Sequence, residues 1–225
     1  MNKDEFIKRS KENLKRILKA EGLLDEKLEL AFEKVPRELF FSESNRENAY
    51  LNNAFDIGYG QTISQPSMIF TMLKKLELNK SHRVLEVGTG SGYVTALLCE
   101  LSHFVYSVEI IPELARLAIE RLVKLGYTNY LVLVRDGSIG LPEYAPYDRI
   151  IVSAASPQIP NSLINQLSDN GIITIPIGGL ELQRLMVVKK IYGNVKVFQD
   201  IPCRFVPLVG EEGFKEDAIK NYRIK

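Results

Sequence analysis

Residues 83–109, RVLEVGTGSGYVTALLCELSHFVYSVE, decide the fold. Two short apolar runs, RVLEV and FVYSVE, flank a glycine-rich turn and an apolar helical segment. Short apolar runs rich in β-branched residues and bounded by glycine are typical of buried strands. The pattern therefore predicts a strand, a tight turn, a helix and a second strand, which is the repeating unit of a parallel sheet.

The same alternation continues toward the C-terminus. YLVLV at 130–134 and YDRIIVS at 147–153 are further apolar runs, and PELARLAIERLVKLG at 112–126 has a helical pattern. Near-continuous apolar strands separated by helices indicate a mostly parallel sheet that is covered on both faces. We therefore predict the α/β class, with a doubly wound sheet.

The last third of the chain changes character, because strands follow one another without helices. The segments are a helix at IPNSLINQL (159–167), then strands at GIITIPI (171–177), LMVVKKI (185–191), KVFQD (196–200) and CRFVPL (203–208). Gly193 and Asn194 are the expected hairpin turn. Consecutive strands of this kind predict an antiparallel C-terminal edge on the sheet.

The N-terminal segment is expected to be helical. Residues 3–20 place their apolar side chains on one helical face. A second helix is expected to bury Leu28, Ala31 and Phe32 and to end near Val35, because Pro36 disfavours helix at the residue before it.

The length of 225 residues suits one large domain. We expect residues 1–80 to form a helical lead-in with one important loop, inside the same domain as a core at 81–210. Residues 211–225 are expected to form a C-terminal tail.

Composition excludes several classes of partner. Lys plus Arg total 29 against 28 for Asp plus Glu, a net charge of +1, which gives no reason to expect a nucleic acid or a membrane surface. The charged N-terminus lacks the apolar core of a signal peptide, and no stretch is long and apolar enough to span a membrane. Cys99 lies in an apolar run and is expected to be a buried thiol. These features predict a soluble, cytoplasmic protein; its oligomeric state is left open.

Three glycines after the first strand predict a ligand site. Gly88, Gly90 and Gly92 lie at the carboxyl edge of the sheet, where open α/β sheets bind ligands; the alternative is a tight turn without a ligand. A dinucleotide fingerprint needs a small residue where this chain has Tyr93, and no Gly-Lys-Ser/Thr follows for a phosphate loop. The order E-x-G-x-G-x-G, beginning at Glu86, instead resembles the first motif of S-adenosylmethionine-dependent methyltransferases.

That resemblance implies a Rossmann-like methyltransferase sheet and S-adenosylmethionine as cofactor. The turn would hold the amino-acid end of the cofactor. The implied cofactor-binding residues of this turn are Glu86, Gly88, Thr89, Gly90 and Gly92.

Acidic residues end the next two strands. Glu109 follows Gly92 by 17 residues (109 − 92), close to the spacing at which a carboxylate meets a ribose, although it could merely end a strand. Asp136, followed by Gly137, ends the third strand, where the methyltransferase resemblance implies an acidic residue near the adenine; Asp-Gly is also a common turn pair.

A loop upstream of the sheet points to one methyltransferase family. FDIGYGQTISQPSM at 55–68 is similar to the pattern of protein-L-isoaspartate O-methyltransferases, and most of the chain resembles that family in order, including RFVPLVG at 204–210. No Asn/Asp-Pro-Pro-Tyr/Phe follows the fourth strand, which disfavours methylation of nitrogen. Two positions depart from the family: Asn52 stands where an aspartate is usual, and Val209 where some members have a threonine.

The resemblance implies that the acceptor is the free α-carboxylate of an L-isoaspartyl residue in a damaged protein or peptide. The methyl ester would collapse to a succinimide, which initiates repair. Such a carboxyl has a pKa of about 3.5 and is ionised at neutral pH, so no general base is required to deprotonate it. His82 and His103 precede strands at the opposite edge of the sheet and are expected to be structural.

Ser64 is the candidate catalytic side chain. It is expected to hold the acceptor carboxylate together with Gln61 and Thr62, while Ile63 and Ser64 also contact the cofactor. The alternative is that Ser64 only caps the helix beginning near Pro66. No metal site is expected.

Other functions stay open at this point. The same fold could methylate a small molecule or RNA, or the chain could be a non-catalytic relative that only binds the cofactor. A nicotinamide-dependent oxidoreductase is disfavoured by Tyr93.

Overall fold

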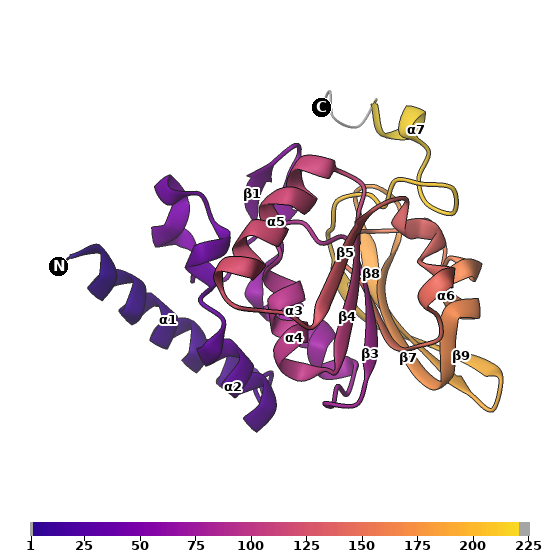
Figure 1. The fold of residues 1–225 in the computed structure, drawn as a ribbon, viewed down its shortest axis with the longest axis horizontal. Helices are drawn as coiled ribbons and strands as arrows, with labels where there is room; N and C mark the ends of the chain where they lie inside the picture. Colours follow the sequence, from indigo (N-terminus) through magenta and orange to yellow (C-terminus); the bar gives the residue numbers. More distant parts are fainter. Residues whose placement is uncertain (1, 221–225) are drawn as a thin grey trace.

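A seven-stranded sheet organises the computed structural model, which describes residues 2–220 (Figure 1). Its strands lie in the order β5-β4-β3-β6-β7-β8-β9. They are β3 (Arg83–Val87), β4 (Phe104–Glu109), β5 (Tyr130–Val134), β6 (Tyr147–Val152), β7 (Leu167–Gly178), β8 (Gln183–Ile191) and β9 (Asn194–Cys203). The pairs from β5 to β7 are parallel and the last two are antiparallel. The predicted doubly wound α/β sheet with an antiparallel C-terminal edge is therefore confirmed.

Both faces of this sheet are covered. The covering helices are α3 (Pro66–Lys75), α4 (Tyr93–Leu101), α5 (Pro112–Lys124) and α6 (Asn161–Gln166). Val84 and Leu85 are adjacent in β3 and therefore point to opposite faces. Val84 joins an apolar cluster with Phe70 of α3, whereas Leu85 joins a second cluster with Leu163 of α6. The unbroken apolar runs of the strands follow from this two-sided burial.

The N-terminal helices extend the first of these clusters. They are α1 (Lys3–Ala20) and α2 (Glu26–Lys34), followed by the short 3-10 helices η1 (Arg37–Phe40) and η2 (Glu43–Asn48). Leu14, Leu18 and Phe32 are fully buried in the cluster that contains Val84 of the sheet. The helical lead-in and the sheet therefore share one apolar core; the division at residue 80 stays a prediction.

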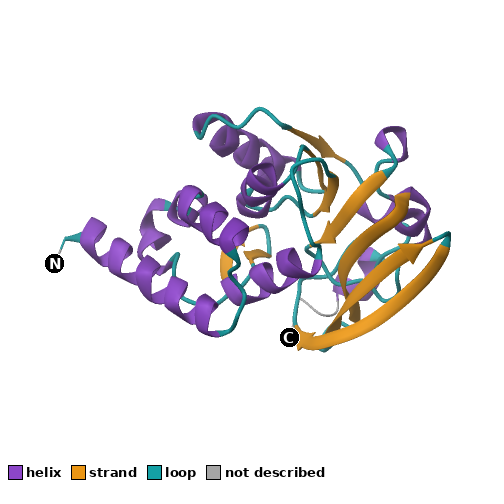
Figure 2. Cartoon of the chain, turned by 90° about the horizontal axis from the view of Figure 1, so that it is seen from below, coloured by secondary structure: helices purple, strands orange, loops and turns teal. Residues whose placement is uncertain are grey.

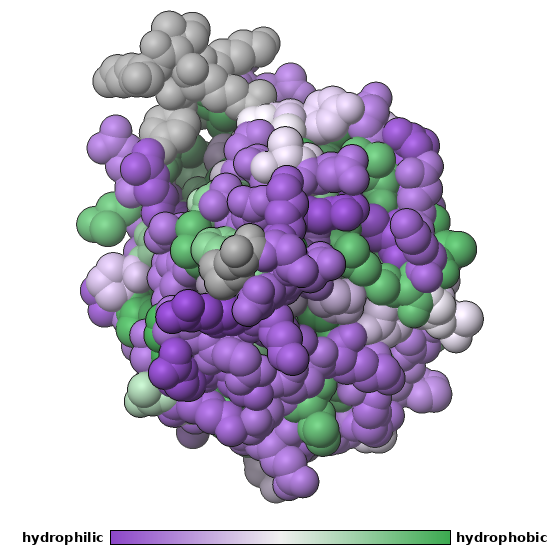
Figure 3. All heavy atoms as spheres, turned by 90° about the vertical axis from the view of Figure 1, so that its left-hand side faces the viewer, coloured by the Kyte–Doolittle hydropathy of each residue, from purple (hydrophilic) through white to green (hydrophobic). Residues whose placement is uncertain are grey.

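Local sequence sets the ends of these two helices. Asn2 Oδ1 accepts from the Glu5 amide at 2.8 Å, and Asp25 Oδ1 accepts from the Leu28 amide at 2.9 Å, so each helix has a side-chain N-cap. The second helix ends at Val35, which is extended before the proline as predicted. The outward face of this end of the molecule is mostly hydrophilic (Figure 3).

A small two-stranded sheet precedes α3. Its strands β1 (Phe55–Gly58) and β2 (Gln61–Ile63) pair antiparallel, where the sequence predicted only a loop. Gly58, Tyr59 and Gly60 all have positive φ, at 90°, 58° and 68°. Two glycines let the chain reverse over this short distance, because they enter that conformation without the strain of a Cβ.

Two details of the C-terminal strands differ from the prediction. The hairpin turn is formed by Tyr192 and Gly193, with φ of 49° and 76°, and Asn194 already belongs to β9. KVFQD and CRFVPL are not two strands, because β9 runs continuously to Cys203 and the chain then leaves the sheet. The physical reason is that β8 begins at Gln183, which pairs with Cys203, so the chain beyond has no partner strand.

Figure 2 shows the helix-rich N-terminal half and the long C-terminal strands at opposite ends of the molecule. Within residues 2–220, no helix combines the length and the apolar character needed to cross a bilayer.

Leu18→Ala tests whether α1 unfolds together with the sheet. Leu18 is 0% exposed, so the cavity should lower the free energy of unfolding by about 2–5 kcal/mol in urea denaturation, within one transition. Leu30→Ala is the control; Leu30 is 65% exposed, and the change should be within about 0.5 kcal/mol. A separate early transition would contradict a shared core.

Candidate active site

One cavity lies at the carboxyl ends of the central strands. It is open to solvent, and its empty space, counted out to the open mouth, is about 790 Å³. Its walls come from residues 61–64, 87–91, 108–110, 153–154 and 206–209, with Tyr93, Val94 and Gly137. The glycine turn and residues 61–64, which we call the acceptor segment after their expected role, therefore line the same cavity. They come from separate parts of the chain, on either side of α3 and β3.

The glycine turn has the backbone that its sequence predicts. Gly88, Gly90 and Gly92 have φ of 93°, 53° and 88°. Gly88 and Gly90 line the cavity, whereas Gly92 faces α5, where an added Cβ would come within 3.1 Å of Ala118 Cβ. Gly92 thus supports the turn through close helix packing and does not line the cavity wall.

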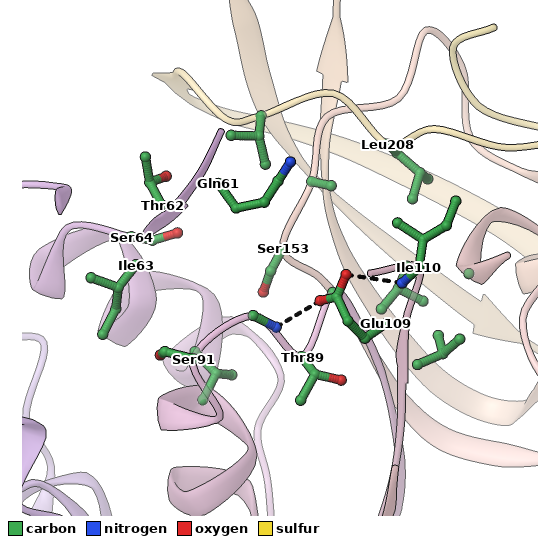
Figure 4. A pocket seen from close by; sticks show the side chains of 18 of the residues that line it. Gln61, Thr62, Ile63, Ser64, Thr89, Ser91, Glu109, Ile110, Ser153 and Leu208 are labelled. Atoms are coloured by element: carbon green, nitrogen blue, oxygen red, sulfur yellow. Dashed lines mark hydrogen bonds between the residues drawn. The ribbon is translucent and has the colours of Figure 1, made fainter. Parts of the chain in front are cut away.

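Glu109 lies at the end of β4 and lines the cavity (Figure 4). Its Oε2 accepts from the Gly90 amide at 2.8 Å, and Oε1 accepts from the amides of Ile110 and Ile111 at 2.9 and 3.0 Å. A carboxylate has about four acceptor positions, so these three donors leave one for a ligand. The expected contact with both ribose hydroxyls stays a prediction, and in this conformation there is room for one.

Glu86 is buried beneath the turn and does not line the cavity. Its Oε2 accepts from Thr95 Oγ1 and Ser107 Oγ, both at 2.6 Å. Ser107 Oγ also forms a hydrogen bond with Thr89 Oγ1 at 2.6 Å, and Thr89 does line the cavity. Hydrogen bonds through Ser107 therefore connect Glu86 to Thr89 in the cavity wall.

Burial also changes the acidity of Glu86. Desolvation raises the pKa of this fully buried carboxyl to about 8, although the hydrogen bonds from Ser107 and Thr95 oppose the rise. Its Oε1 has no hydrogen-bond partner among residues 2–220. The carboxyl is therefore largely protonated in the folded protein at neutral pH.

Asp136 takes the turn-forming role that the sequence left as an alternative. Its Oδ1 accepts from the Ser138 amide at 2.8 Å, and its Oδ2 accepts from the Glu211 amide at 2.7 Å. The carboxylate thus ties the end of β5 to the C-terminal segment and does not line the cavity, whereas Gly137 does. An added Cβ on Gly137 would lie 2.6 Å from Val87 Cγ1, so only glycine fits there.

The acceptor segment forms the opposite wall. Gln61, Thr62, Ile63 and Ser64 all line the cavity, and Figure 4 shows the Ser64 hydroxyl and the Gln61 side chain pointing inward. Within the described residues, the Ser64 hydroxyl makes no hydrogen bond and does not cap α3. It is therefore available to a ligand.

Asn52 explains why Ser64 is not needed as a cap. Its Oδ1 accepts from the Ser67 amide in the first turn of α3, at 3.0 Å. An aspartate, usual at this position in the family that the sequence resembles, would place an acceptor oxygen there too. The asparagine therefore keeps this acceptor and removes only the negative charge.

Sequence reasoning assigned no role to two further wall segments. Ser153 and Ala154 directly follow β6, and their place at the carboxyl end of a predicted strand was a usable signal. Residues 206–209 were marked only by the family resemblance of RFVPLVG, in which some members have a cofactor-contacting threonine at the position of Val209. They reach the cavity because the Ala155 amide donates to the Val206 carbonyl at 2.8 Å and the Leu208 amide to the Ala155 carbonyl at 2.7 Å. Val209, the second departure from the family pattern, lines the cavity within this segment.

The histidines and Cys99 lie outside the cavity. The His103 amide donates to the His82 carbonyl at 2.9 Å, which places both at the amino ends of β3 and β4, as expected. Cys99 is 4% exposed in the core, as predicted. Among residues 2–220 there is no cluster of His, Cys, Asp or Glu side chains that could hold a metal ion.

Known proteins resemble this chain over nearly its whole length. A family model described as protein-L-isoaspartate(D-aspartate) O-methyltransferase matches residues 9–213. The protein-L-isoaspartate O-methyltransferase of Dictyoglomus turgidum is 47% identical, covering 93% of this chain and 95% of its own. Its namesake from Methanopyrus kandleri is 43% identical, covering 95% and 97%.

Two solved structures have a fold similar to that of this chain. A protein-L-isoaspartate O-methyltransferase has a TM-score of 0.82 at 29% identity, covering 95% of this chain and 69% of its own. A putative enzyme of that name from Plasmodium falciparum, in complex with S-adenosyl-L-homocysteine, has a TM-score of 0.77 at 25% identity, covering 88% and 97%.

Glu86→Gln tests the buried carboxyl. The pKa of Glu86 is about 8 in the folded protein, against 4.5 for an ordinary glutamate side chain, so between these pH values the folded state binds a proton that the unfolded state has lost. The contribution of Glu86 to stability is thus full below about pH 4.5 and is lost as the pH rises through about 8. Glu86→Gln has no titrating carboxyl at this position. Its free energy of unfolding should therefore not show the part of the decline with rising pH that Glu86 causes.

Urea denaturation from about pH 5 to about pH 9 measures the effect, because the stability of the variant relative to the wild type should grow across this window. Glu113→Gln, at an exposed position of α5, is the matched control and should keep the wild-type slope. Parallel curves for wild type and Glu86→Gln would refute the protonated carboxyl.

Proposed function

This chain belongs to the protein-L-isoaspartate(D-aspartate) O-methyltransferase family, and from that premise we propose how its own residues carry out the methyl transfer. It is an enzyme that methylates the free carboxylate of L-isoaspartyl residues in damaged proteins and peptides, with S-adenosylmethionine as cofactor. The methyl ester then closes to a succinimide, which starts repair. The observation that carries the assignment is the cavity that the glycine turn shares with the acceptor segment.

The charge of the cavity walls suits S-adenosylmethionine. Among the described lining residues, Glu109 is the only charged one, and no lysine or arginine is present. Such a wall suits a cationic sulfonium and ribose hydroxyls, and it has no cationic side chain for the pyrophosphate of a nicotinamide cofactor. We assign the ribose side to Glu109, the amino-acid end to Gly88–Gly90 and the base side to the wall that contains Gly137. When bound, the cofactor supplies an electrophilic methyl group.

The acceptor carboxylate needs orientation and no deprotonation. It is ionised at neutral pH, because a carboxyl of this kind has a pKa near about 3.5. We assign the Ser64 hydroxyl to donate to one of its oxygens, with Gln61 and the backbone near Thr62 completing the site. Neutral donors hold the carboxylate in place while its free oxygen stays nucleophilic. Orientation of this kind is itself a large source of rate enhancement.

Apolar side chains on the same walls exclude water from the reacting atoms. Ile63 is 4% exposed, and Leu208 is 6% exposed on the opposite wall. Removal of water strengthens the hydrogen bonds that hold the carboxylate.

We place the enzyme in the cytoplasm, a reducing compartment that suits its two free cysteines.

The substrate class is tested with matched peptides that contain isoaspartate or normal aspartate at the same position. The wild-type protein should transfer methyl from S-adenosylmethionine to the isoaspartyl peptide, with little transfer to the aspartyl peptide. Equal transfer to both, or transfer only to RNA or a small molecule, would refute the proposed acceptor.

Ser64→Ala should lower kcat/KM on the isoaspartyl peptide about ten- to a hundredfold. The reason is the loss of one hydrogen bond to a charged group, which is worth about 1.5–3 kcal/mol. Calorimetry should show cofactor affinity nearly unchanged. Ser42→Ala, at an exposed serine of the lead-in, is the matched control. Wild-type turnover in Ser64→Ala would remove this hydroxyl from the mechanism.

Glu109→Ala should weaken binding of S-adenosylmethionine about ten- to a hundredfold in calorimetric titration. The variant loses a charged acceptor for the ribose and also the bond that holds the Gly90 amide. Glu113→Ala, four residues further on and exposed, should bind as the wild type does. Unchanged affinity in Glu109→Ala would refute the ribose assignment.

A further inference from the structure

Arg37, the first residue of η1, lies behind the acceptor wall and is 0% exposed. Its Nε donates to the Ala49 carbonyl oxygen at 2.7 Å, and its Nη2 donates to the Ser64 carbonyl oxygen at 2.8 Å. Ser64 lines the cavity and Arg37 does not. The guanidinium therefore binds the carbonyl group of Ser64 from outside the cavity.

The same guanidinium also contacts the glycine-turn side of the site. Its central carbon lies 4.7 Å from the ring centroid of Tyr93, the first residue of α4, and 5.4 Å from that of Phe41. Phe41 in turn packs edge-on against Phe55 of β1, at 5.7 Å between centroids. One side chain thus joins the acceptor segment to the helix that follows the glycine turn.

Arg37 has no acidic side chain as an ion-pair partner among the described residues, and Tyr93 and Tyr50 are the groups that favour its charge. Of the ion pairs formed by residues 2–220, none includes Arg37, and its Nη1 is buried without a hydrogen-bond partner. Burial lowers the pKa of Arg37 to about 10, which still leaves it a cation at neutral pH. Burial of a cation costs free energy unless an anion lies beside it. A side chain whose only role was to bind two carbonyl oxygens could be a neutral donor, which would avoid this cost.

We propose that Arg37 is a positioning residue for methyl transfer: it fixes the Ser64 peptide and places a positive potential behind the Ser64 hydroxyl that favours an anionic acceptor. The absent counter-charge is the substrate carboxylate itself, which arrives on the other side of the cavity wall. This inference rests on the assignment of Ser64 as the acceptor-binding side chain.

Its position behind the wall gives Arg37 an advantage over an arginine inside the cavity. A guanidinium in direct contact would form a bidentate pair with the carboxylate and occupy both of its oxygens. From behind Ser64 the charge attracts the anion across a low-dielectric layer without contacting it. The acceptor oxygen therefore stays free to attack.

Arg37→Met and Arg37→Lys separate charge from packing. Met retains much of the volume of the side chain but has no charge and no hydrogen-bond donor. Lys retains the charge but cannot donate to the Ala49 and Ser64 carbonyl oxygens in the geometry of a guanidinium. Arg37→Met should lower kcat/KM on the isoaspartyl peptide at least about tenfold, while cofactor affinity by calorimetry stays within about twofold. Arg116→Met is the matched control, because Arg116 is exposed on α5 and pairs only with Glu120 in the described chain.

A binding ratio distinguishes an electrostatic role from a merely structural one. The dissociation constant of the isoaspartyl peptide is compared with that of the same peptide whose reacting carboxylate is replaced by a carboxamide. The wild type and Arg37→Lys should prefer the anionic peptide, and Arg37→Met should lose about tenfold of that preference. Misfolding or loosened packing would weaken both peptides alike.

Each outcome decides between the alternatives. Equal weakening of both peptides, or a loss confined to cofactor affinity, would overturn the electrostatic role. Should Arg37→Met fail to fold, Arg37→Lys carries the test: wild-type kcat/KM in that variant would refute the positioning role. Absence of wild-type turnover on the isoaspartyl peptide would instead count against the proposed function, since the binding ratio is measured without turnover.

Discussion

The hydrogen bond from the Gly90 amide to Glu109 holds the site together. It joins the turn after β3 to the end of β4 at 2.8 Å, and the same carboxylate accepts the first amides beyond β4. The turn can approach the carboxylate only because its glycines adopt positive φ, which side chains would oppose. This one contact therefore links the shape of the turn to the position of the only charged side chain among the described residues that line the cavity.

Two differently built halves meet in the cavity. One part of its wall comes from the ends of parallel strands, which a two-sided core fixes in place. The rest comes from residues 61–64 and 206–209, neither of which belongs to the parallel strands. Arg37 and Asn52 hold the chain near residues 61–64 from behind, through the Ser64 carbonyl and the Ser67 amide.

The sequence predicted the half that local patterns encode. The strand, glycine turn, helix and second strand at 83–109 were all predicted correctly, because apolar runs and glycine spacing act over a few residues. The hairpin of β1 and β2 was missed, since its strands are short and its turn includes Tyr59 at positive φ. Residues 206–209 were missed as a wall because their partner, Ala155, lies some fifty residues earlier in the chain. Arg37 gave no signal, since burial of an unpaired arginine runs against the usual rule.

The origin of the walls has a consequence for biosynthesis. The glycine turn, Glu109 and Ser153 have all been made once the chain has passed the end of β6, but the cavity still lacks its wall at 206–209. Strands β7, β8 and β9 must be synthesised between these two stages. A nascent chain therefore carries most of the cavity wall before the residues that complete the cavity have been made.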